Sequence, residues 1–483
     1  MKILPFTDLP NHLSAATIVK YYDEPGNEFN KYYDIPDKVK SNTFHLYFTS
    51  SSLFPSVEFA NKIYYLLYVL LFPVSILAVI KKLKGDIRYS LFAFLFLWNF
   101  EVSFGFVGYT LSVPFLILLL LFLVDFFETP TYKYTFYLMF LNILLFFIHF
   151  QQAIYALVML FVFGLMNYHS FFRNIHKKLI AVIPVIILMF ISYSSDASEH
   201  YEGLAQYLFR YYTSDFWINY YQRFIDLGVL ENFYWIPETP GLIFTLSVSL
   251  FIFIPLIYLL FKKRNEISLI ILEGNNKYFF VFGFISLILF FILPDNIPGQ
   301  NIIYQRFLIF VMIVSVIFLS IFSQYFNFKK YFYLGLVVLG LHIYVSSDYF
   351  SDFKKESRFF SEEIFPVKNN HTLAGLMFDA KFRNSYVYIH FQNYYTIWNK
   401  GITANGNLDY RYSFIRRKEG VDMNILPPHN AWVDIFKVYN PPGYADVDYL
   451  LTRDSTSRSF ENFNLIRTSG DWHLYENFLK IKK

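Results

Sequence analysis

The chain contains no cysteine. A disulfide framework, a thiolate nucleophile and a cysteine-ligated metal site are therefore excluded. Charged residues are also few, at 16% of 483, and the Lys and Arg clusters flank apolar runs instead of forming a patch that would bind nucleic acid. The phosphate-binding loop, the dinucleotide fingerprint and the HExxH and GxSxG motifs are missing as well. The sequence thus gives no support to nucleic-acid binding or to soluble nucleotide chemistry.

Apolar side chains are correspondingly abundant, because 55% of the residues are hydrophobic and 22% aromatic. A soluble globular protein could not bury that much apolar surface, so we predict an α-helical polytopic membrane bundle. Ten apolar runs can span a bilayer core of about 30 Å, although several have only about 17 residues. Short, paired or broken helices are therefore expected among them. The ten runs cover residues 60–80, 89–104, 108–126, 133–149, 151–167, 178–194, 241–261, 277–293, 307–324 and 330–346.

The distribution of positive charge orients the bundle. If the first run points inward, fourteen Lys and Arg residues fall in the inner connections and only Arg210, Arg223 and Arg306 in the outer ones. This is a strong positive-inside bias. The heavy use of Phe, Tyr, Ile, Asn and Lys indicates an AT-rich genome, so we expect a bacterial plasma membrane with an extracytoplasmic active face. The fourteen inner residues are Lys81, Lys82, Lys84, Arg88, Lys133, Arg173, Lys177, Lys178, Lys262, Lys263, Arg264, Lys277, Lys329 and Lys330.

Three regions follow from this topology. We expect residues 1–58 to form an extracytoplasmic first loop, 59–346 the membrane bundle, and 347–483 an extracytoplasmic mixed α/β domain. Within the bundle, residues 195–240 carry apolar side chains at near-helical spacing, which predicts an amphipathic helix at the interface. An outside N-terminal segment of this length needs a helix to carry it across, so one further span is expected upstream. Strands of the last region are expected at 385–391, 431–439, 448–452 and 472–475.

The first loop contains an acid, an amide and an imidazole within five positions, at Asp8, Asn11 and His12. An acid followed closely by proline is typical of a plain helix N-cap, whose carboxylate accepts from free backbone N–H groups. A carboxylate half-withdrawn from water also has a raised proton affinity, which suits a general base acting on a hydroxyl nucleophile. His12 would share the helical face of Asp8 and could orient a phosphate or the acid itself. Both interpretations of Asp8 stay open at this point.

Ionisable residues inside or at the ends of spans are costly, so each is a candidate functional residue. Glu101 lies near two glycines that interrupt an apolar run, where it could equally satisfy freed backbone groups. His149 lies in an outer turn, where a structural cap is the plainer role. Arg306 opens a span; it could extend its charge to the interface, but guanidinium also suits bidentate binding of a lipid phosphate. We favour the phosphate contact for Arg306.

Taken together, these features resemble the GT-C superfamily of integral-membrane glycosyltransferases. The similarity is greatest to a group of bacterial members with an Asp-x-Pro-Asn-His-Leu motif in the first loop, and it covers nearly the whole chain through short motifs. The family's first helix, which should precede the Asp loop, is not seen here. The matching stretches are Asp8, Pro10, Asn11, His12 and Leu13, residues 105–108, Pro294 with Arg306 and Phe307, residues 389–391 and residues 470–475.

The resemblance implies an inverting transfer of a sugar from a polyprenyl-phosphate carrier to a lipid, glycan or protein acceptor on the outer face. Asp8 would be the base that activates the acceptor hydroxyl, and Arg306 would neutralise the departing lipid phosphate. Asn11, His12, Glu101 and His149 would bind substrate. The chemistry agrees, because a phosphate leaving group needs positive charge instead of an acid. A divalent metal could supply charge, but the sequence indicates no ligand set and no cofactor.

Three other classes of protein remain open. An outer-leaflet polysaccharide polymerase or ligase also has many spans and large outer loops, and it depends on Arg and His more than on a first-loop Asp. A transporter or lipid flippase would need polar sites at mid-bilayer and usually a repeat, whereas the polar residues here collect at the outer rim. A structural scaffold would leave His390, His429 and Trp472 as residues that only support the fold of the last region.

Overall fold

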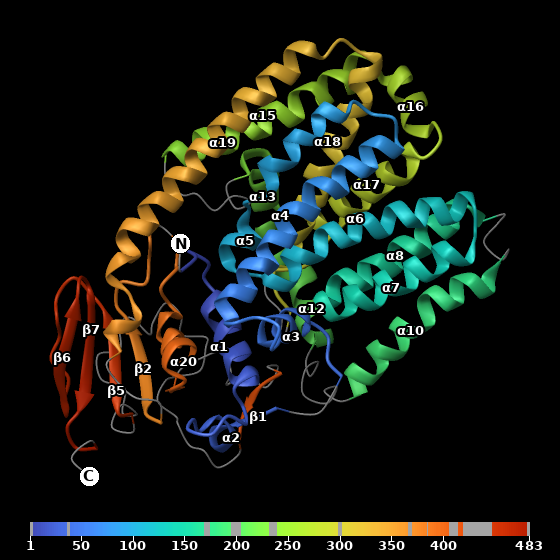
Figure 1. Cartoon of the computed structure of the whole chain (residues 1–483). Coiled ribbons are helices and arrows are strands. Elements are labelled where there is room, and N and C mark those ends of the chain that lie inside the picture. Colours follow the sequence, from blue (N-terminus) through green and yellow to red (C-terminus); the bar gives the residue numbers. More distant parts are fainter. Residues whose placement is uncertain are drawn as a thin grey trace.

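Helices form an elongated bundle in this computed structural model, and a small sheet lies beyond one end of it (Figure 1). Amphipathic and apolar helices make up the bundle, as composition predicts. The structure describes residues 3–35, 39–168, 174–194, 204–230, 239–297, 302–365, 370–383, 385–404, 414–418 and 447–480.

The bundle contains a helical segment at each of the ten apolar runs. Six helices are long and apolar enough to cross a membrane, or seven if the pair α16–α17, bent by 106°, is one span. The expected count of ten spans is therefore not confirmed: α7 and α8 are shorter apolar helices, and the run at 89–104 is broken into a 3-10 helix and a short α-helix. The segments are α4 (Val57–Lys82), η1 (Ile87–Phe96), α5 (Phe100–Phe104), α6 (Val107–Glu128), α7 (Tyr132–Ile148), α8 (Phe150–Met166), α10 (Ile175–Ser194), α15 (Thr239–Lys262), α16 (Arg264–Leu272), α17 (Asn276–Ile292), α18 (Leu308–Tyr325) and α19 (Lys329–Glu356).

The helix α18 lies at the centre of the bundle. Every residue from Leu308 to Phe322 is buried, which fits a helix that is apolar on all sides. Small residues let neighbours approach it closely: a Cβ at Gly283 of α17 would come within 2.6 Å of Val314. The 3-10 turn η3 (Tyr304–Phe307) leads directly into α18, so Arg306 is held at one end of the most buried helix.

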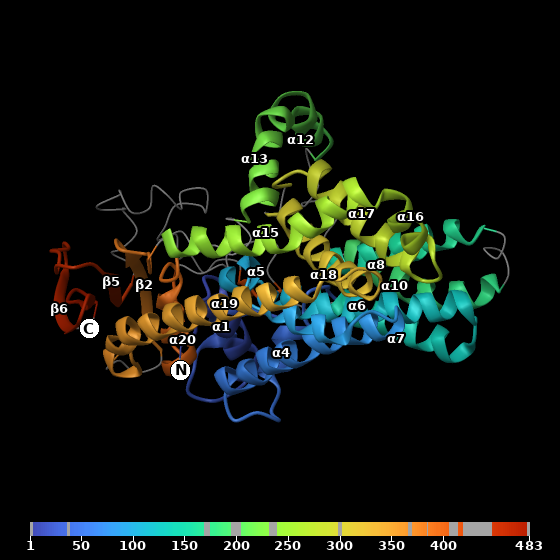
Figure 2. The ribbon, with the colours of Figure 1, turned by 90° about the horizontal axis from the view of Figure 1, so that it is seen from above.

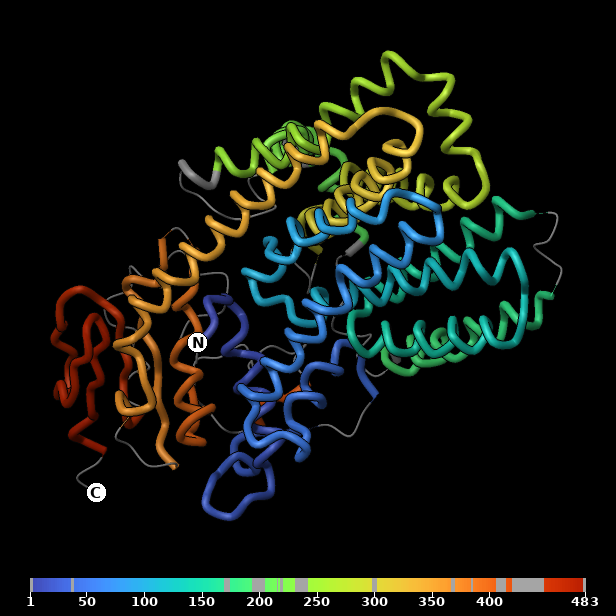
Figure 3. Tube along the Cα trace, turned by 45° about the horizontal axis from the view of Figure 1, so that its top comes forward, coloured from blue at the N-terminus to red at the C-terminus, as the bar shows by residue number. Residues whose placement is uncertain are grey.

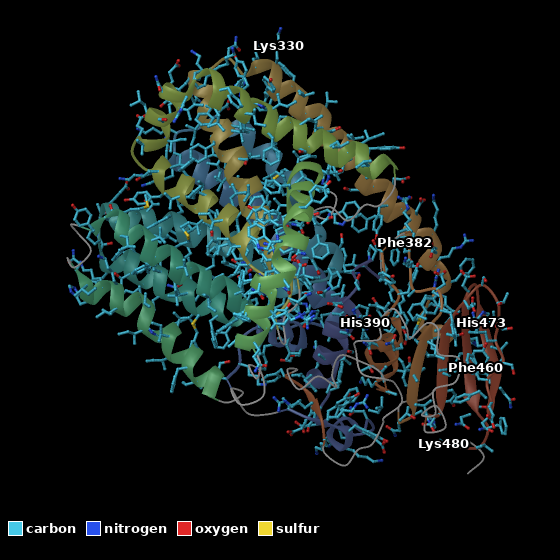
Figure 4. The ribbon with its side chains drawn as sticks, turned by 180° about the vertical axis from the view of Figure 1, so that it is seen from behind. Lys330, Phe382, His390, Phe460, His473 and Lys480 are labelled. Carbon is cyan, nitrogen blue, oxygen red and sulfur yellow. The ribbon has the colours of Figure 1, made fainter. Side chains whose placement is uncertain are left out.

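The connections expected to face inward, which carry the Lys and Arg clusters, lie at one end of the bundle. At the end called here the basic end, Lys82 Nζ lies 2.6 Å from Asp125 and 2.6 Å from Glu128, which joins α4 to α6. Asn275, just before α17, also donates to Glu128 (2.6 Å). Figure 4 places Lys330 at this end, far from the labelled residues of the sheet domain. The turn at 104–108, His149 and Arg306 lie at the opposite end, called here the sheet end.

The N-terminal residues lie at the sheet end, with α1 (Leu9–Lys20) between the bundle and the sheet domain (Figures 1 and 3). The short helix α3 (Phe44–Ser50) packs against α1 and α4. Beyond α1, α2 (Phe29–Tyr32) leads into β1 (Tyr33–Asp34), which pairs antiparallel with β4 (Arg416–Arg417). The first loop is therefore a folded layer wedged between the two larger parts.

The tail domain contains a five-stranded sheet in the order β3-β2-β5-β7-β6. The strand β2 runs parallel to its neighbours β3 and β5, and β7 runs antiparallel to β5 and β6. The helix α20 (Tyr394–Asn399) lies between this sheet and α1 (Figure 1). The strands are β2 (Thr372–Met377), β3 (Ile402–Thr403), β5 (Tyr449–Arg453), β6 (Phe463–Ser469) and β7 (Trp472–Asn477).

The expected strands of the tail have mixed outcomes. Those at 448–452 and 472–475 are confirmed by β5 and β7, whereas the one at 431–439 lies outside the described residues. The one at 385–391 is wrong. Its apolar residues are buried, but the backbone folds back on itself, with Tyr388 N–H donating to Ala380 O and Phe391 N–H to Tyr388 O. The error is explained by composition, because β-branched and aromatic residues favour strands, whereas here they are buried in a turn that has no neighbouring strand.

Ion pairs fasten the tail domain to α19. Arg453 of β5 is only 3% exposed and donates to Asp379 and, at 2.7 Å, to Glu356 at the end of α19. Arg383 lies 2.9 Å from Asp348 and 2.6 Å from Asp352, both on α19. The sheet is therefore held against the last turns of a helix that continues into the bundle.

An arm of three helical segments stands out to one side of the bundle (Figure 2). It comprises α12 (Leu204–Arg210), the π-helical turn η2 (Tyr211–Asp215) and α13 (Phe216–Val229). Helix is therefore present within 195–240, as expected, and its position at the membrane interface stays a prediction. Arg223, fully buried, holds the arm in place by donating to Phe290 O (3.0 Å), Phe291 O (2.6 Å) and Leu293 O (2.6 Å). These acceptors are carbonyls at the C-terminal end of α17, which otherwise lack donors.

Candidate active site

Asp8 lies at the N-terminal end of α1 and is held by its backbone. The N–H groups of Thr7 and Asp8 donate to Ser103 O (3.1 Å) and Phe104 O (2.9 Å). Gly105 permits this approach, because its φ is +87° and a Cβ there would lie 2.9 Å from Leu9 N and 3.0 Å from Asp8 N. Asp8 occupies the N-cap position of α1 but makes no side-chain cap hydrogen bond. Its carboxylate is therefore not occupied by the capping role that its position suggests.

A turn of the tail domain reaches the same segment. His390 precedes η6 (Phe391–Asn393), and its Nε2 lies 3.4 Å from Asp8 Oδ1. Asn393 at the other end of the turn donates to Asn11 Oδ1. All four side chains are largely buried. Figure 4 shows His390 on the side of the tail domain that faces the bundle.

Two further imidazoles line this cluster. The rings of His12 and His45 are 5.6 Å apart in an edge-to-face arrangement, and His45 Nε2 lies 3.0 Å from Asn61 Oδ1. Burial lowers the pKa of His12, against the opposing effect of the Asp8 carboxylate. Burial, with a smaller contribution from His12, lowers the pKa of His45 to about 3. Both rings are therefore neutral at pH 7 and can accept or donate a hydrogen bond.

Arg306 forms the centre of a second cluster. Its Nη1 lies 3.0 Å from Gln151 Oε1 and 3.3 Å from His149 Nε2, and its carbonyl oxygen accepts from Tyr109 OH. The guanidinium lies over the ring of Phe106, 4.8 Å from its centroid. Arg306 is 6% exposed. A cation is therefore held at the sheet end, surrounded by aromatic rings and a side-chain amide.

Glu101 lies beside this second cluster. The residue is 1% exposed, and its Oε2 has no hydrogen-bond partner among the described residues. It is close enough to Arg306 for the two charges to interact. A buried carboxylate near a buried guanidinium offsets part of the cost of placing either charge away from water.

The turn at 104–108 joins the two clusters. One side of it bonds to the Asp8 backbone, and Phe106 on the same turn lies under Arg306. At Gly108 a Cβ would lie 2.4 Å from Ile148 O, so α6 packs directly against the end of α7 that carries His149. The structure therefore brings all six predicted residues to the sheet end: Asp8, Asn11 and His12 in the first cluster, and Glu101, His149 and Arg306 in the second.

Sequence reasoning missed two contributors to the first cluster. From the sequence, a role in supporting the tail fold is favoured for His390, although residues 389–391 are among those that carry the family resemblance. His45 gave no signal at all, because a single histidine in a polar segment is unremarkable. Neither contact could be found without the fold, since 382 positions separate Asp8 from His390 and 37 separate it from His45.

Comparison of the chain with known protein families, with curated proteins and with solved structures found no match. Among the described residues, no group of three or more His, Cys, Asp or Glu side chains could hold a metal ion. Evidence for the role of each residue at the sheet end therefore comes from the geometry of this chain alone.

Proposed function

We propose that the chain is a membrane glycosyltransferase that moves a sugar from a polyprenyl-phosphate carrier to a lipid, glycan or protein acceptor. One observation carries this proposal: a largely buried carboxylate that makes no capping hydrogen bond, Asp8, lies at the same end of the bundle as a buried guanidinium, Arg306. Sugar transfer from a lipid phosphate needs these two groups, a base for the acceptor and a cation for the leaving phosphate.

Asp8 is the base in this proposal. It lies beside two imidazoles, His12 and His390, and its side chain keeps 16% of its surface exposed. An acceptor hydroxyl that reaches it would lose its proton as the oxygen attacks the anomeric carbon, with inversion at that carbon. General base catalysis of this kind contributes roughly 10² to 10⁴ in rate.

Arg306 binds the carrier phosphate in this proposal. Its guanidinium is oriented by Gln151 and His149 and supported by the ring of Phe106. Guanidinium N–H groups match two phosphate oxygens at once, and the positive charge stabilises the phosphate as the glycosidic bond breaks. The remaining substrate-binding residues in this proposal are Asn11, His12, Glu101 and His149.

The membrane setting follows from the same proposal. The basic end faces inward, as the positive-inside bias favours, and the sheet end with its tail domain faces the outside of a bacterial plasma membrane. Counting the bent pair α16–α17 as one span, and α7, α8 and the broken segment η1–α5 as three short spans, gives the ten expected from the sequence. The polyprenyl chain lies in the bilayer beside the bundle, which suits a donor whose phosphate stays at the membrane surface.

Sugar transfer by membranes containing the full chain tests the proposal, with a pool of polyprenyl-phosphate sugars as donors. We expect native protein to transfer, Asp8→Asn to lose at least about 100-fold in rate, and Asp23→Asn to match native. Asp23 is the control because it is an exposed acid of the same N-terminal segment. Native protein without transfer would refute the proposal.

Transfer by Asp8→Asn at the native rate would instead refute the base role. An outer-leaflet polysaccharide polymerase or ligase would then be favoured, because the contact between Arg306 and His149 (3.3 Å) supplies the residue types on which that class depends.

A further inference from the structure

The tail domain touches the candidate base through one short turn. His390 and Asn393 lie at the two ends of η6 and meet Asp8 and Asn11, respectively, in the first turn of α1. Both partners of each contact are at least four-fifths buried. Two contacts from one turn to one helical turn fix the orientation of the partners more strictly than a single contact does.

The turn itself has little freedom. At Gly375 of β2, a Cβ would lie 2.6 Å from Gln392 Cβ, so η6 packs against the backbone of the sheet. Phe391 stacks on Trp472 of β7, with ring centroids 5.6 Å apart and an angle of 13° between the planes. The position of the His390 imidazole is therefore set by the core of the tail domain.

The domain is also held against the bundle at other points. Trp398 of α20 donates to Glu58 Oε1 of α4 (2.9 Å), and Lys400 lies 2.6 Å from Glu24, four residues beyond the C-terminal end of α1. These contacts keep η6 at α1 independently of His390. Loss of the imidazole would consequently leave the tail domain docked.

The geometry at Asp8 gives the imidazole a specific task. Asp8 Oδ1 is buried beside His390 Nε2, at 3.4 Å, which is slightly longer than a hydrogen bond. Contacts of this kind commonly shorten when substrate binds. With a proton on Nε2, the imidazole donates to Oδ1, stops the carboxylate rotating about its Cβ–Cγ bond and leaves the second oxygen to the acceptor.

We propose that His390 is a positioning residue of the tail domain that orients the Asp8 carboxylate toward the acceptor hydroxyl. The inference depends on the proposed function, and it gives the tail domain a direct part in the reaction. His390 does not itself take the acceptor's proton, which passes to Asp8.

Two substitutions of His390 and one control separate positioning from structure. His390→Leu removes the donor and His390→Gln keeps an amide N–H in a similar place. His473→Gln is the control, because His473 is a buried histidine of the same domain whose ring contacts Thr468 and Asp454 on the distant side of the sheet (Figure 4). We expect His390→Leu to lower kcat by about 100-fold with the KM for the carrier unchanged. We expect His390→Gln to stay within about 10-fold of native and His473→Gln within about 2-fold.

Docking of the tail is measured in the same variants by cross-linking. The chain has no cysteine, so Glu24→Cys with Lys400→Cys introduces the only two thiols, and a short thiol-reactive cross-linker joins them when the tail is docked. This pair replaces one docking contact and leaves the contact between Trp398 and Glu58 in place, so every His390 variant is compared with the otherwise native chain that carries the same two cysteines. A lower kcat with native cross-linking supports the positioning role. A lower kcat together with lost cross-linking overturns it, because the histidine would then only hold the domain in place.

The failure of this inference differs from the failure of the proposed function. If native protein transfers sugar, Asp8→Asn does not, and His390→Leu transfers as native, then only the role of His390 is overturned. If native protein transfers nothing, the proposed function is overturned and the role of His390 with it.

Discussion

Replacing Gly105 by alanine would create a steric clash with the backbone of Asp8 and Leu9. The new Cβ would lie 2.9 Å from Leu9 N and 3.0 Å from Asp8 N, whereas ordinary contact begins at 3.4 Å. The Asp8 segment would therefore have to retreat by about 0.5 Å, or the turn would have to open. The backbone of Gly105, at φ +87°, adds a second cost of about 1–2 kcal/mol for any side chain.

Gly274 supplies the matched control. It also has a positive φ, +53°, but a Cβ there would meet nothing within 4 Å. Gly274→Ala therefore carries the conformational strain without the collision. The difference between the two variants measures the contact between the 104–108 turn and the Asp8 segment.

We expect Gly274→Ala to lower the free energy of unfolding by about 1 kcal/mol and to leave sugar transfer unchanged. Gly105→Ala should lower it by about 2–3 kcal/mol and slow transfer by about 10-fold, since a misplacement of about 1 Å can cost 100-fold. Thermal unfolding in detergent gives the first quantity and initial transfer rates give the second. Equal losses in the two variants would refute the reasoning that Gly105 sets the position of Asp8.

Three further predictions concern the same end of the bundle. Arg223→Met should lower the free energy of unfolding by about 3 kcal/mol or more, because three carbonyls of α17 lose a charged donor; a loss below about 1 kcal/mol in chemical denaturation would contradict this. Arg306→Lys keeps the charge but loses the planar pair of donors, so kcat/KM for the carrier should fall by roughly 10- to 100-fold, and native kinetics would count against phosphate binding there. The buried His12 and His45 have lowered pKa values in the folded chain, so the unfolded chain takes up protons first as the pH falls. The contribution of these rings to the free energy of unfolding should be constant above about pH 6.5. Below that pH it should decline by up to about 1.4 kcal/mol per pH unit for each ring. Unfolding midpoints that do not change between pH 7.5 and 5 would show that the rings are not buried and neutral.

The sequence predicted the helical bundle and the meeting of several polar residues at one end. Alternation of spans places every second turn at the same end, so His149 and Arg306 could be assigned together from apolar periodicity and charge alone. Contact between the two requires more than a shared end. Tyr109 of α6 lies against both residues, because its hydroxyl donates to Arg306 O and its ring centroid lies 5.3 Å from that of His149.

The rest of the site depends on contacts that no local pattern contains. The segment that carries His390 is rich in β-branched and aromatic residues, which favour a strand, but its backbone forms turns. Asp8 was open to a capping role that the backbone geometry alone could decide. Packing of segments hundreds of residues apart determines both outcomes.

The helix α19 has a mechanical consequence for the whole molecule. It runs without interruption for 28 residues, about 42 Å. It begins at the basic end and ends at the ion pairs that join it to the tail domain. A stiff rod of that length acts as a lever: a change in tilt of about 5° at one end moves the other by about 4 Å. Helix tilt adjusts to bilayer thickness, so the thickness of the surrounding membrane should set how well His390 meets Asp8. Transfer rates in vesicles of short and long acyl chains would reveal this dependence, and equal rates would show that the tail moves with the bundle as one rigid body.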